Sequence, residues 1–261
     1  MPTLRDRASI AFRGWQATAL ALTGTTRRRL AARRGMVCVL MYHRVIADDA
    51  RADEIEPGMY VRAATFAAHL RWLGAHFRFV PLREAQERPA DPDGAPRVAL
   101  TFDDGWRDNL THAWPLLAAA GAPATVFLAT DWIAAAESDG RFLAPDDVRR
   151  MADAGIDFGA HTGAHPRLTG LSDEAVREEL TRSKRAVAEW TRRPCTHFAY
   201  PYGDCDDRVA RLAGEEFGLC AAIANRWWRP GGDRTRISRI GVHEDMSSTP
   251  RRLAALLALR P

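Results

Sequence analysis

Short apolar runs alternate with amphipathic stretches along residues 36–260. Apolar runs rich in β-branched residues and bounded by turn residues predict buried strands, whereas apolar positions recurring every three or four residues predict helices. We expect strands at 37–42, 79–80, 98–102, 124–129, 156–160, 197–200, 219–223 and 237–242. We expect helices at 66–77, 82–87, 109–120, 145–155, 172–192, 207–217 and from Pro250 onward. This alternation predicts a parallel sheet, and about seven such units predict closure into a distorted (β/α) barrel.

Residue types at the helix ends refine these boundaries. Thr65 is the expected N-cap of the helix over 66–77, and Ser172 that of the long helix, with Asp173 and Glu174 in its first turn. The polar stretch over 46–60 and the proline-rich stretch over 88–96 predict surface loops.

Length and composition are those of a globular protein. The chain has 261 residues, of which 46% are hydrophobic and 27% charged, without internal repeats or a low-complexity linker. We therefore expect one catalytic domain over residues 35–261. The cysteines, Cys38, Cys195, Cys205 and Cys220, form no CxxC pair and are expected to be free thiols in a reducing compartment.

Residues 1–34 form a basic segment, with eight arginines against the single acid Asp6. Ile10, Phe12, Trp15 and Leu20 lie among these arginines, so the segment could form an amphipathic helix on an anionic membrane surface. A solvated tail, or a helix packed on the domain itself, would also fit the pattern. Its apolar stretch is too short to span a bilayer, and no signal peptide is evident.

From this segment we expect a cytoplasmic protein, peripheral on the inner face of the membrane. The chain has a formal net charge of +4, and Lys184 is its only lysine, a bias typical of genome composition. Because the excess of positive charge lies in residues 1–34, a basic patch covering the catalytic domain is not supported. We therefore expect no nucleic-acid partner.

Two adjacent carboxylates follow the expected strand at 98–102. Asp103 and Asp104 precede Gly105, which favours a sharp turn. Neighbouring carboxylates repel unless a cation or proton compensates, so one could bind a metal while the other remains a free base. A simple turn that caps the next helix is the alternative.

Two histidines four residues apart follow the strand at 156–160. His161 and His165 could present both imidazoles to one ion from a tight loop, which Gly163 and Pro166 favour over a helix. A histidine pair on a surface helix is the alternative. In a parallel barrel, however, the carboxyl ends of all strands share one face, so Asp104, His161 and His165 could form a three-ligand site with an open position.

Three motifs in this order resemble those of the polysaccharide deacetylase family, which is carbohydrate esterase family 4 with its NodB homology domain. They are Thr101-Phe102-Asp103-Asp104-Gly105, His161-Thr162-Gly163-Ala164-His165 and Tyr200-Pro201-Tyr202-Gly203. Met41-Tyr42-His43-Arg44-Val45 also resembles a segment common near the start of such domains. The resemblance covers about residues 36–245.

The resemblance implies a role for each matched residue. Asp104, His161 and His165 would hold a divalent metal, most often zinc, with cobalt or nickel as alternatives. Asp103 would be the general base that activates water, and the backbone N–H of Tyr202, after Pro201, would stabilise the oxyanion. The implied substrate is an N-acetylated amino sugar in a polysaccharide or a lipid-linked sugar.

The same resemblance implies a histidine near the C-terminus that protonates the leaving amine. His243, after the last expected strand, is the best candidate, with His43, His112 and His197 as competitors. A surface histidine beside Glu244 and Asp245 is the plain alternative for His243.

Two departures from the family pattern affect details. Many members carry an arginine ahead of the proline of the third motif, which orients the base, whereas this chain has Phe198-Ala199-Tyr200 there. A clear Asp–Trp fourth motif is also absent. Trp227 and Trp228 lie in that region and could stack on a sugar or pack in the core.

The leading hypothesis is thus a metal-dependent hydrolase that removes N-acetyl groups from an amino sugar. One alternative keeps the chemistry but removes a formyl or acetyl group from a lipid-linked aminosugar. Another is a non-catalytic, metal-containing glycan-binding domain, which the intact Asp103 disfavours because a binder gains nothing from an unligated carboxylate beside a metal.

Overall fold

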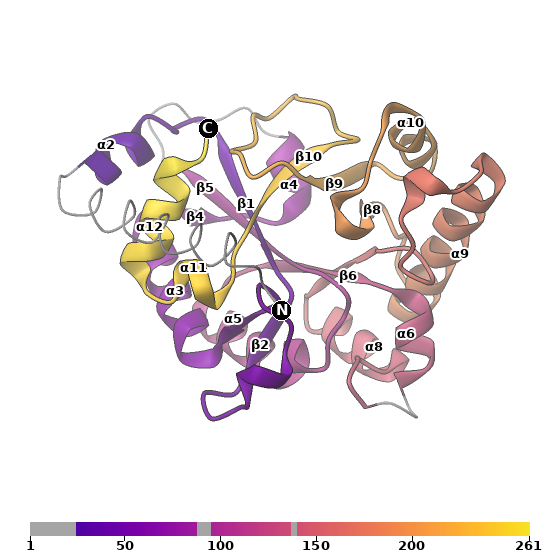
Figure 1. Ribbon diagram of the computed structural model, residues 1–261, viewed down its shortest axis with the longest axis horizontal. Coiled ribbons are helices and arrows are strands. Elements are labelled where there is room, and N and C mark those ends of the chain that lie inside the picture. Colours follow the sequence, from indigo (N-terminus) through magenta and orange to yellow (C-terminus); the bar gives the residue numbers. More distant parts are fainter. Residues whose placement is uncertain (1–24, 88–94, 137–139) are drawn as a thin grey trace.

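The computed structural model describes residues 25–87, 95–136 and 140–261, so the expectation for residues 1–24 lies outside the described part. Parallel strands form a central barrel with helices around it (Figure 1). The strands are β1 (Val37–Tyr42), β2 (Arg44–Ile46), β3 (Tyr60–Arg62), β4 (Arg78–Phe79), β5 (Arg97–Phe102), β6 (Ala124–Leu128), β7 (Asp157–Ala160), β8 (His197–Ala199), β9 (Leu219–Ile223) and β10 (Ile237–Gly241).

Seven of these strands close the barrel in the order β1-β10-β9-β8-β7-β6-β5, with β5 pairing back onto β1. Every pairing in this sheet is parallel. β4 pairs only with Arg97 and Val98 at the start of β5, while β6 pairs with the last three residues of that strand. The expected seven-stranded (β/α) barrel is confirmed.

Alternating residues of each strand fill the barrel interior. In β1, Val37 and Val39 pack inside with Ala99 of β5, while Cys38 and Leu40 face the helices. Because side chains alternate along a strand, the inner face of β5 continues from Ala99 through Thr101 to the position of Asp103. The first carboxylate thus emerges from the core at the carboxyl end of the barrel.

All seven expected helices are present, whereas the short helices over 130–134 and 244–247 were not expected. The helices and single turns are α2 (Thr25–Ala31), η1 (Ala52–Glu54), α3 (Ala63–His76), α4 (Leu82–Glu87), η2 (Asn109–Ala113), α5 (Trp114–Ala120), α6 (Thr130–Ala134), α8 (Pro145–Asp153), η3 (Leu168–Gly170), α9 (Asp173–Thr191), η4 (Pro201–Gly203), α10 (Asp207–Glu216), α11 (Glu244–Ser247) and α12 (Pro250–Leu259). None of the helices in the described residues is both long and apolar enough to cross a membrane.

Two local expectations are wrong. Arg62, not Thr65, is the N-cap of α3, and the Thr65 hydroxyl donates instead to Glu244 Oε1 at 2.9 Å. The polar stretch over 46–60 also meets strands at both ends, because β2 and β3 form a small parallel sheet of their own. The expected cap of the long helix is confirmed, since Ser172 Oγ accepts the N–H of Ala175.

Candidate active site

Asp104, His161 and His165 meet at the carboxyl ends of β5 and β7. The Nε2 atoms of the two histidines lie 3.2 Å apart. Asp104 Oδ1 lies 3.6 Å from His161 Nε2 and 3.5 Å from His165 Nε2. Asp104 and His161 are buried, and His165 is half-buried at the opening. The structure thus brings together the three expected ligands.

Hydrogen bonds outside this cluster leave the inner atoms free for an ion. Nδ1–H of His161 donates to the Ala199 carbonyl at 2.7 Å, which leaves the Nε2 lone pair facing Asp104. Asp104 Oδ2 accepts the indole N–H of Trp106 at 3.0 Å, so Oδ1 is the oxygen that faces the histidines. Sequence reasoning did not identify Trp106, although it follows the Asp-Asp-Gly turn directly.

The spacing of these three atoms suits a small divalent metal ion. A tetrahedral ion with nitrogen and oxygen ligands at about 2.0–2.1 Å separates them by about 3.4 Å, close to the observed separations. Burial, together with the neighbouring His161, lowers the pKa of His165 to about 4 against the opposing effect of Asp104. His165 is therefore neutral at physiological pH, as a metal ligand must be.

The loop that carries both histidines is held by the helix α9. Glu179 Oε2 accepts the N–H groups of Gly163 and Ala164 at 2.8 and 3.1 Å, and Arg182 forms ion pairs with Glu179 and Asp131. A side chain at Gly163 would collide with the guanidinium of Arg182.

Unusual backbone conformations are concentrated at this site. Asp104, Thr162, His165 and Tyr202 have φ between 58° and 75°, and they are four of the six non-glycine residues with positive φ in the described chain. Such conformations cost about 1–3 kcal/mol each and persist only where the surroundings enforce them. At Gly105, with φ of 77°, an added Cβ would lie 2.7 Å from Leu128, so this turn requires glycine.

Asp103 forms a buried, bidentate ion pair with Arg239 of β10. Nη1 and Nη2 of the arginine lie 2.6 and 2.8 Å from the two carboxylate oxygens. Burial by itself would raise the pKa of Asp103, but Arg239 and then His161 hold it at about 2. Asp103 is thus ionised and fixed in orientation beside the three-residue cluster.

Sequence reasoning also missed Arg239. The third motif lacks the arginine expected ahead of its proline, and here an arginine from another strand reaches the same carboxylate. Its side chain is fully buried beside Thr101 and lies over the ring of Phe127. An arginine inside the apolar strand at 237–242 was the available signal, because a buried charge requires a partner.

The turn of the third motif lies beside the histidine loop. The Tyr202 ring lies 4.7 Å from that of His165, and the guanidinium of Arg167 lies over the Tyr202 ring at 4.3 Å. Among the described residues, hydrogen bonds of this turn use the N–H groups of Gly203 and Asp204, and none uses that of Tyr202. Pro201, the first residue of this turn, is buried.

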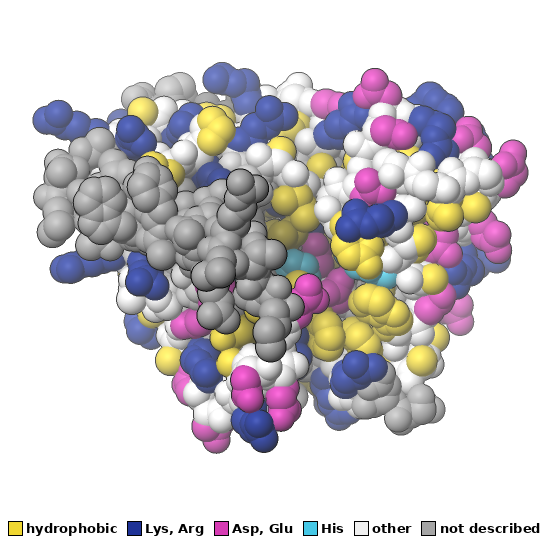
Figure 2. Space-filling model, in the orientation of Figure 1, with side chains coloured by type: hydrophobic (Ala, Val, Ile, Leu, Met, Phe, Trp, Pro, Cys, Tyr) yellow, Lys and Arg dark blue, Asp and Glu magenta, His cyan; other side chains and the backbone are white. Residues whose placement is uncertain are grey.

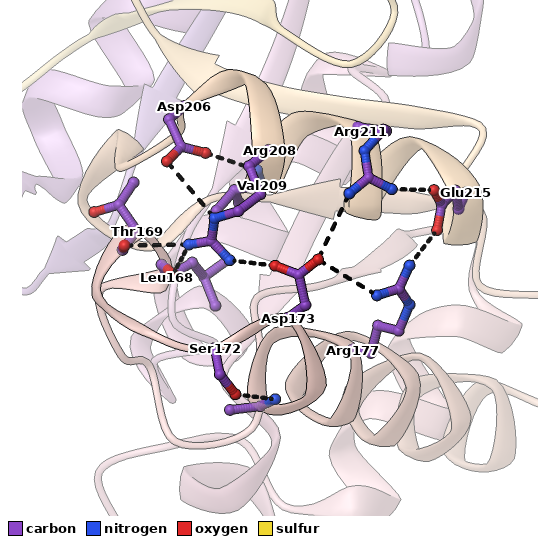
Figure 3. A network of polar contacts seen from close by, with 11 residues as sticks. Leu168, Thr169, Ser172, Asp173, Arg177, Asp206, Arg208, Val209, Arg211 and Glu215 are labelled. Carbon is purple, nitrogen blue, oxygen red and sulfur yellow. Dashed lines mark hydrogen bonds and ion pairs between the residues drawn. The ribbon is translucent and has the colours of Figure 1, made fainter.

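Polar contacts join this turn to the helices behind it. Asp204 Oδ2 accepts both the N–H and the hydroxyl of Thr169, in the loop that follows His165. Figure 3 shows how Arg208 of α10 reaches the carbonyl of Thr169 and the carboxylate of Asp173 at the start of α9. The second and third motif loops are thereby fixed to each other.

His243 follows β10 as the N-cap of α11, with Nδ1 3.5 Å from Asp245 Oδ2. Burial lowers its pKa, and Asp245 opposes this. Glu244 ties the segment down by accepting the N–H of Arg62 at 2.9 Å.

The competing histidines occupy different positions. His43 directly follows β1, so it lies at the carboxyl end of the barrel, as the candidate ligands do. His197 is the first residue of β8 and lies 3.3 Å from Asp157, the first residue of β7. It therefore lies at the opposite end of these strands from the candidate ligands.

A row of aromatic side chains extends from His165. Trp106 contacts Phe142, Phe142 contacts Trp132, and Trp132 contacts His165, with ring centroids 4.6–5.1 Å apart. Figure 2 shows histidine side chains at the centre of one face, among acidic and hydrophobic ones. Trp227 and Trp228, in contrast, are buried at 3% and 7% exposure, so their packing is structural and the alternative of sugar stacking is wrong.

Comparison with known proteins gives a consistent assignment. The family model for polysaccharide deacetylases matches residues 90–221. YxkH of Bacillus subtilis is 26% identical over 178 residues, which cover 67% of this chain but only 60% of that protein. The chitooligosaccharide deacetylase of a Bradyrhizobium species is 30% identical over 166 residues, covering 60% of this chain and 70% of the relative. The poly-beta-1,6-N-acetyl-D-glucosamine N-deacetylase of Staphylococcus epidermidis is 25% identical, and the match covers 85% of this chain and 84% of the relative.

Solved structures share the fold. The deacetylase PplD of Streptococcus pyogenes, in complex with acetate, superposes with a TM-score of 0.73 at 21% identity and covers 84% of this chain and 96% of its own. IcaB of Ammonifex degensii gives a TM-score of 0.69 at 23% identity, and the match covers 85% of this chain and 97% of IcaB. With the family model matching half of the sequence, the chain belongs to the polysaccharide deacetylase family.

Proposed function

We propose that this protein is a metal-dependent hydrolase that removes N-acetyl groups from amino sugars in a glycan. The observation that carries this proposal is the position of Asp103, ionised and held by Arg239, directly beside the cluster of Asp104, His161 and His165. Asp103 is an ionised carboxylate outside the candidate ligand set and lies next to the three residues that could hold a metal. This arrangement suits hydrolysis better than glycan binding alone.

Asp104, His161 and His165 would hold one divalent ion, with zinc favoured by the donor set and spacing. Such an ion, when bound, would supply Lewis acidity and a water of lowered pKa. Asp103 would take the proton from the attacking water. The N–H of Tyr202 would donate to the oxygen of the amide carbonyl as negative charge develops there.

His243 would return a proton to the leaving amine. Its position after the carboxyl end of β10, at the face of the barrel that holds the candidate ligands, supports this role over His197 at the start of β8, and Asp245 would stabilise the protonated ring. His43, which follows β1 at the same face, remains the competitor. Replacement of each histidine separately by glutamine, with rates followed across pH, distinguishes them, since only loss of the acid removes the alkaline limb of the profile.

The substrate we propose is a polymer or oligomer of N-acetylglucosamine. The named relatives from Bradyrhizobium and Staphylococcus epidermidis act on chitooligosaccharide and poly-beta-1,6-N-acetyl-D-glucosamine, respectively. A lipid-linked form of such a sugar remains part of the proposal. The four cysteines are free thiols, which supports a cytoplasmic location.

The test is acetate and formate release from N-acylated oligosaccharides and lipid-linked sugars, before and after chelation and zinc add-back. We expect zinc-dependent acetate release by the wild type and a loss of at least ~100-fold in Asp103→Asn, the usual size of a general-base contribution. Zinc content should remain equal in both. Formate release would favour the lipid-linked deformylase, and glycan binding without release would favour the non-catalytic domain. Unchanged turnover in Asp103→Asn would remove the proposed base.

A further inference from the structure

Three helices on one side of the barrel carry no carboxylate. α2, α3 and α12 contain arginines and histidines but neither Asp nor Glu, and α12 packs against both α2 and α3 (Figure 1). The arginines with described side chains within these helices are Arg28, Arg29, Arg71, Arg251 and Arg252, and Arg33, Arg34 and Arg260 follow the ends of α2 and α12. We call this surface the α2–α12 face.

An apolar groove of about 660 Å³ runs through the α2–α12 face. Leu30, Trp72 and Phe77 contribute to its apolar lining. Arg34 and Arg251, both exposed, also line it and bring positive charge to its rim. The groove therefore combines a hydrophobic lining with cationic edges.

A second, smaller hollow of about 230 Å³ lies where α2 meets the end of α12. Arg29, Arg33 and Arg260 line it together with Leu259. Among the described residues, Leu259 and Tyr202 are the only large hydrophobic side chains recorded as exposed, and Tyr202 lies at the candidate active site. The α2–α12 face thus presents an outward leucine among arginines.

We propose that the α2–α12 face docks on an anionic phospholipid bilayer, with arginines at the headgroup phosphates and Leu259 and the groove in contact with apolar lipid. Positive charge attracts the protein to an anionic surface, and apolar side chains add binding that charge cannot supply. A nucleic acid would use the arginines but would gain nothing from the exposed Leu259 or from the apolar part of the groove. The proposal concerns described residues and is independent of residues 1–24 and of the deacetylase activity.

The test is co-sedimentation of the full chain with vesicles of mixed phosphatidylglycerol and phosphatidylcholine, and with vesicles of phosphatidylcholine alone. We expect binding to the mixed vesicles that weakens as salt is added. Arg251→Glu/Arg252→Glu should weaken it by at least about 25-fold, since each arginine near an anionic surface contributes roughly fivefold. Acidic residues in the first turn of α12 suit the helix dipole, so this variant should fold.

The matched control is Arg185→Glu/Arg193→Glu, which makes the same change of charge on exposed residues of α9 and the segment after it, on the opposite side of the barrel (Figure 1). It should bind mixed vesicles within about threefold of the wild type, and both variants should deacetylate a soluble chitooligosaccharide normally. Equal binding to phosphatidylcholine alone, wild-type binding by the α12 variant, or binding to duplex DNA without binding to vesicles would each overturn the proposal.

Discussion

Arg239 is the residue on which the ionisation of Asp103 depends. Asp103 is 2% exposed, and burial acts to raise its pKa. In Arg239→Gln, we expect this effect to dominate, so that the carboxyl is protonated at higher pH than in the wild type. Because a general base must be deprotonated, the acidic limb of the kcat/KM profile should move to higher pH, and stability should fall by about 3–5 kcal/mol.

The measurement is deacetylation of a soluble chitooligosaccharide across pH, with urea unfolding of the same samples. Arg239→Lys retains the charge but loses the bidentate geometry, so its acidic limb should lie between those of the other two proteins. An unshifted limb in Arg239→Gln, with a folded protein, would show that the arginine does not control the base.

The candidate ligands could be predicted from sequence, whereas their supports could not. Asp104, His161 and His165 follow strands, and the carboxyl ends of parallel strands meet at one face. Arg239 pairs with a carboxylate 136 positions earlier in the chain, and no local pattern specifies such a contact. The burial of Trp227 likewise depends on its indole N–H reaching the carbonyl of Leu257 in α12.

At the scale of elements, α9 acts as a support for the histidine loop. Glu179, with a side chain only 14% exposed, accepts two consecutive N–H groups of that loop. In Glu179→Ala, these donors lose their acceptor and the loop loses its anchor, so we expect zinc affinity to fall about 10- to 100-fold. Competition with a chromophoric chelator measures this independently of turnover.

Two further variants test the same contact. Glu179→Gln keeps one acceptor oxygen and should lose less affinity than Glu179→Ala. Glu178→Ala alters the neighbouring, exposed residue of α9 and should bind zinc as the wild type does. Equal zinc affinity in Glu179→Ala and Glu178→Ala would show that α9 does not position the loop.

A buried histidine joins α3 to α11. His69 Nε2–H donates to the Ser247 carbonyl at 2.5 Å, and Nδ1 accepts from the Tyr42 hydroxyl at 3.3 Å, so the neutral ring uses both nitrogens. Burial lowers its pKa from 6.5 to about 4. The unfolded chain therefore binds this proton first as the pH falls, and stability declines between pH 6.5 and pH 4, by about 3 kcal/mol in total.

Urea unfolding at pH 7 and pH 5 measures this contribution. Between pH 7 and pH 5, the free energy of unfolding of the wild type should fall by about 2 kcal/mol more than that of the His69→Gln variant, because glutamine does not titrate. His76→Gln, at an exposed position of the same helix, should keep the wild-type dependence. A His69→Gln variant that loses as much stability as the wild type would contradict the assignment.

At the scale of the whole molecule, alternating strands and helices predicted a barrel because a parallel sheet of this length buries its faces by closing. The pairing of β5 with both β1 and β4 was not predictable, since register depends on contacts between distant strands. β2 and β3 were missed because they border a polar stretch that predicts a loop and pair only with each other.

The boundary of the folded domain also belongs to this scale. The sequence predicts that the catalytic domain begins at residue 35. In the structure, α2 packs on α12 with Leu30 buried. Arg33 Nη2 also donates a hydrogen bond to the Arg260 carbonyl at 2.9 Å. We therefore predict that removal of residues 1–24 leaves the melting temperature near that of the full chain. Removal of residues 1–34 should lower it by about 5 °C or more, because the loss of Leu30 alone costs about 1.5–3 kcal/mol. Circular dichroism measures both, with turnover of a soluble chitooligosaccharide as the control for a native fold. Equal melting temperatures of the two truncated proteins would place the boundary after residue 34, with α2 as an appendage.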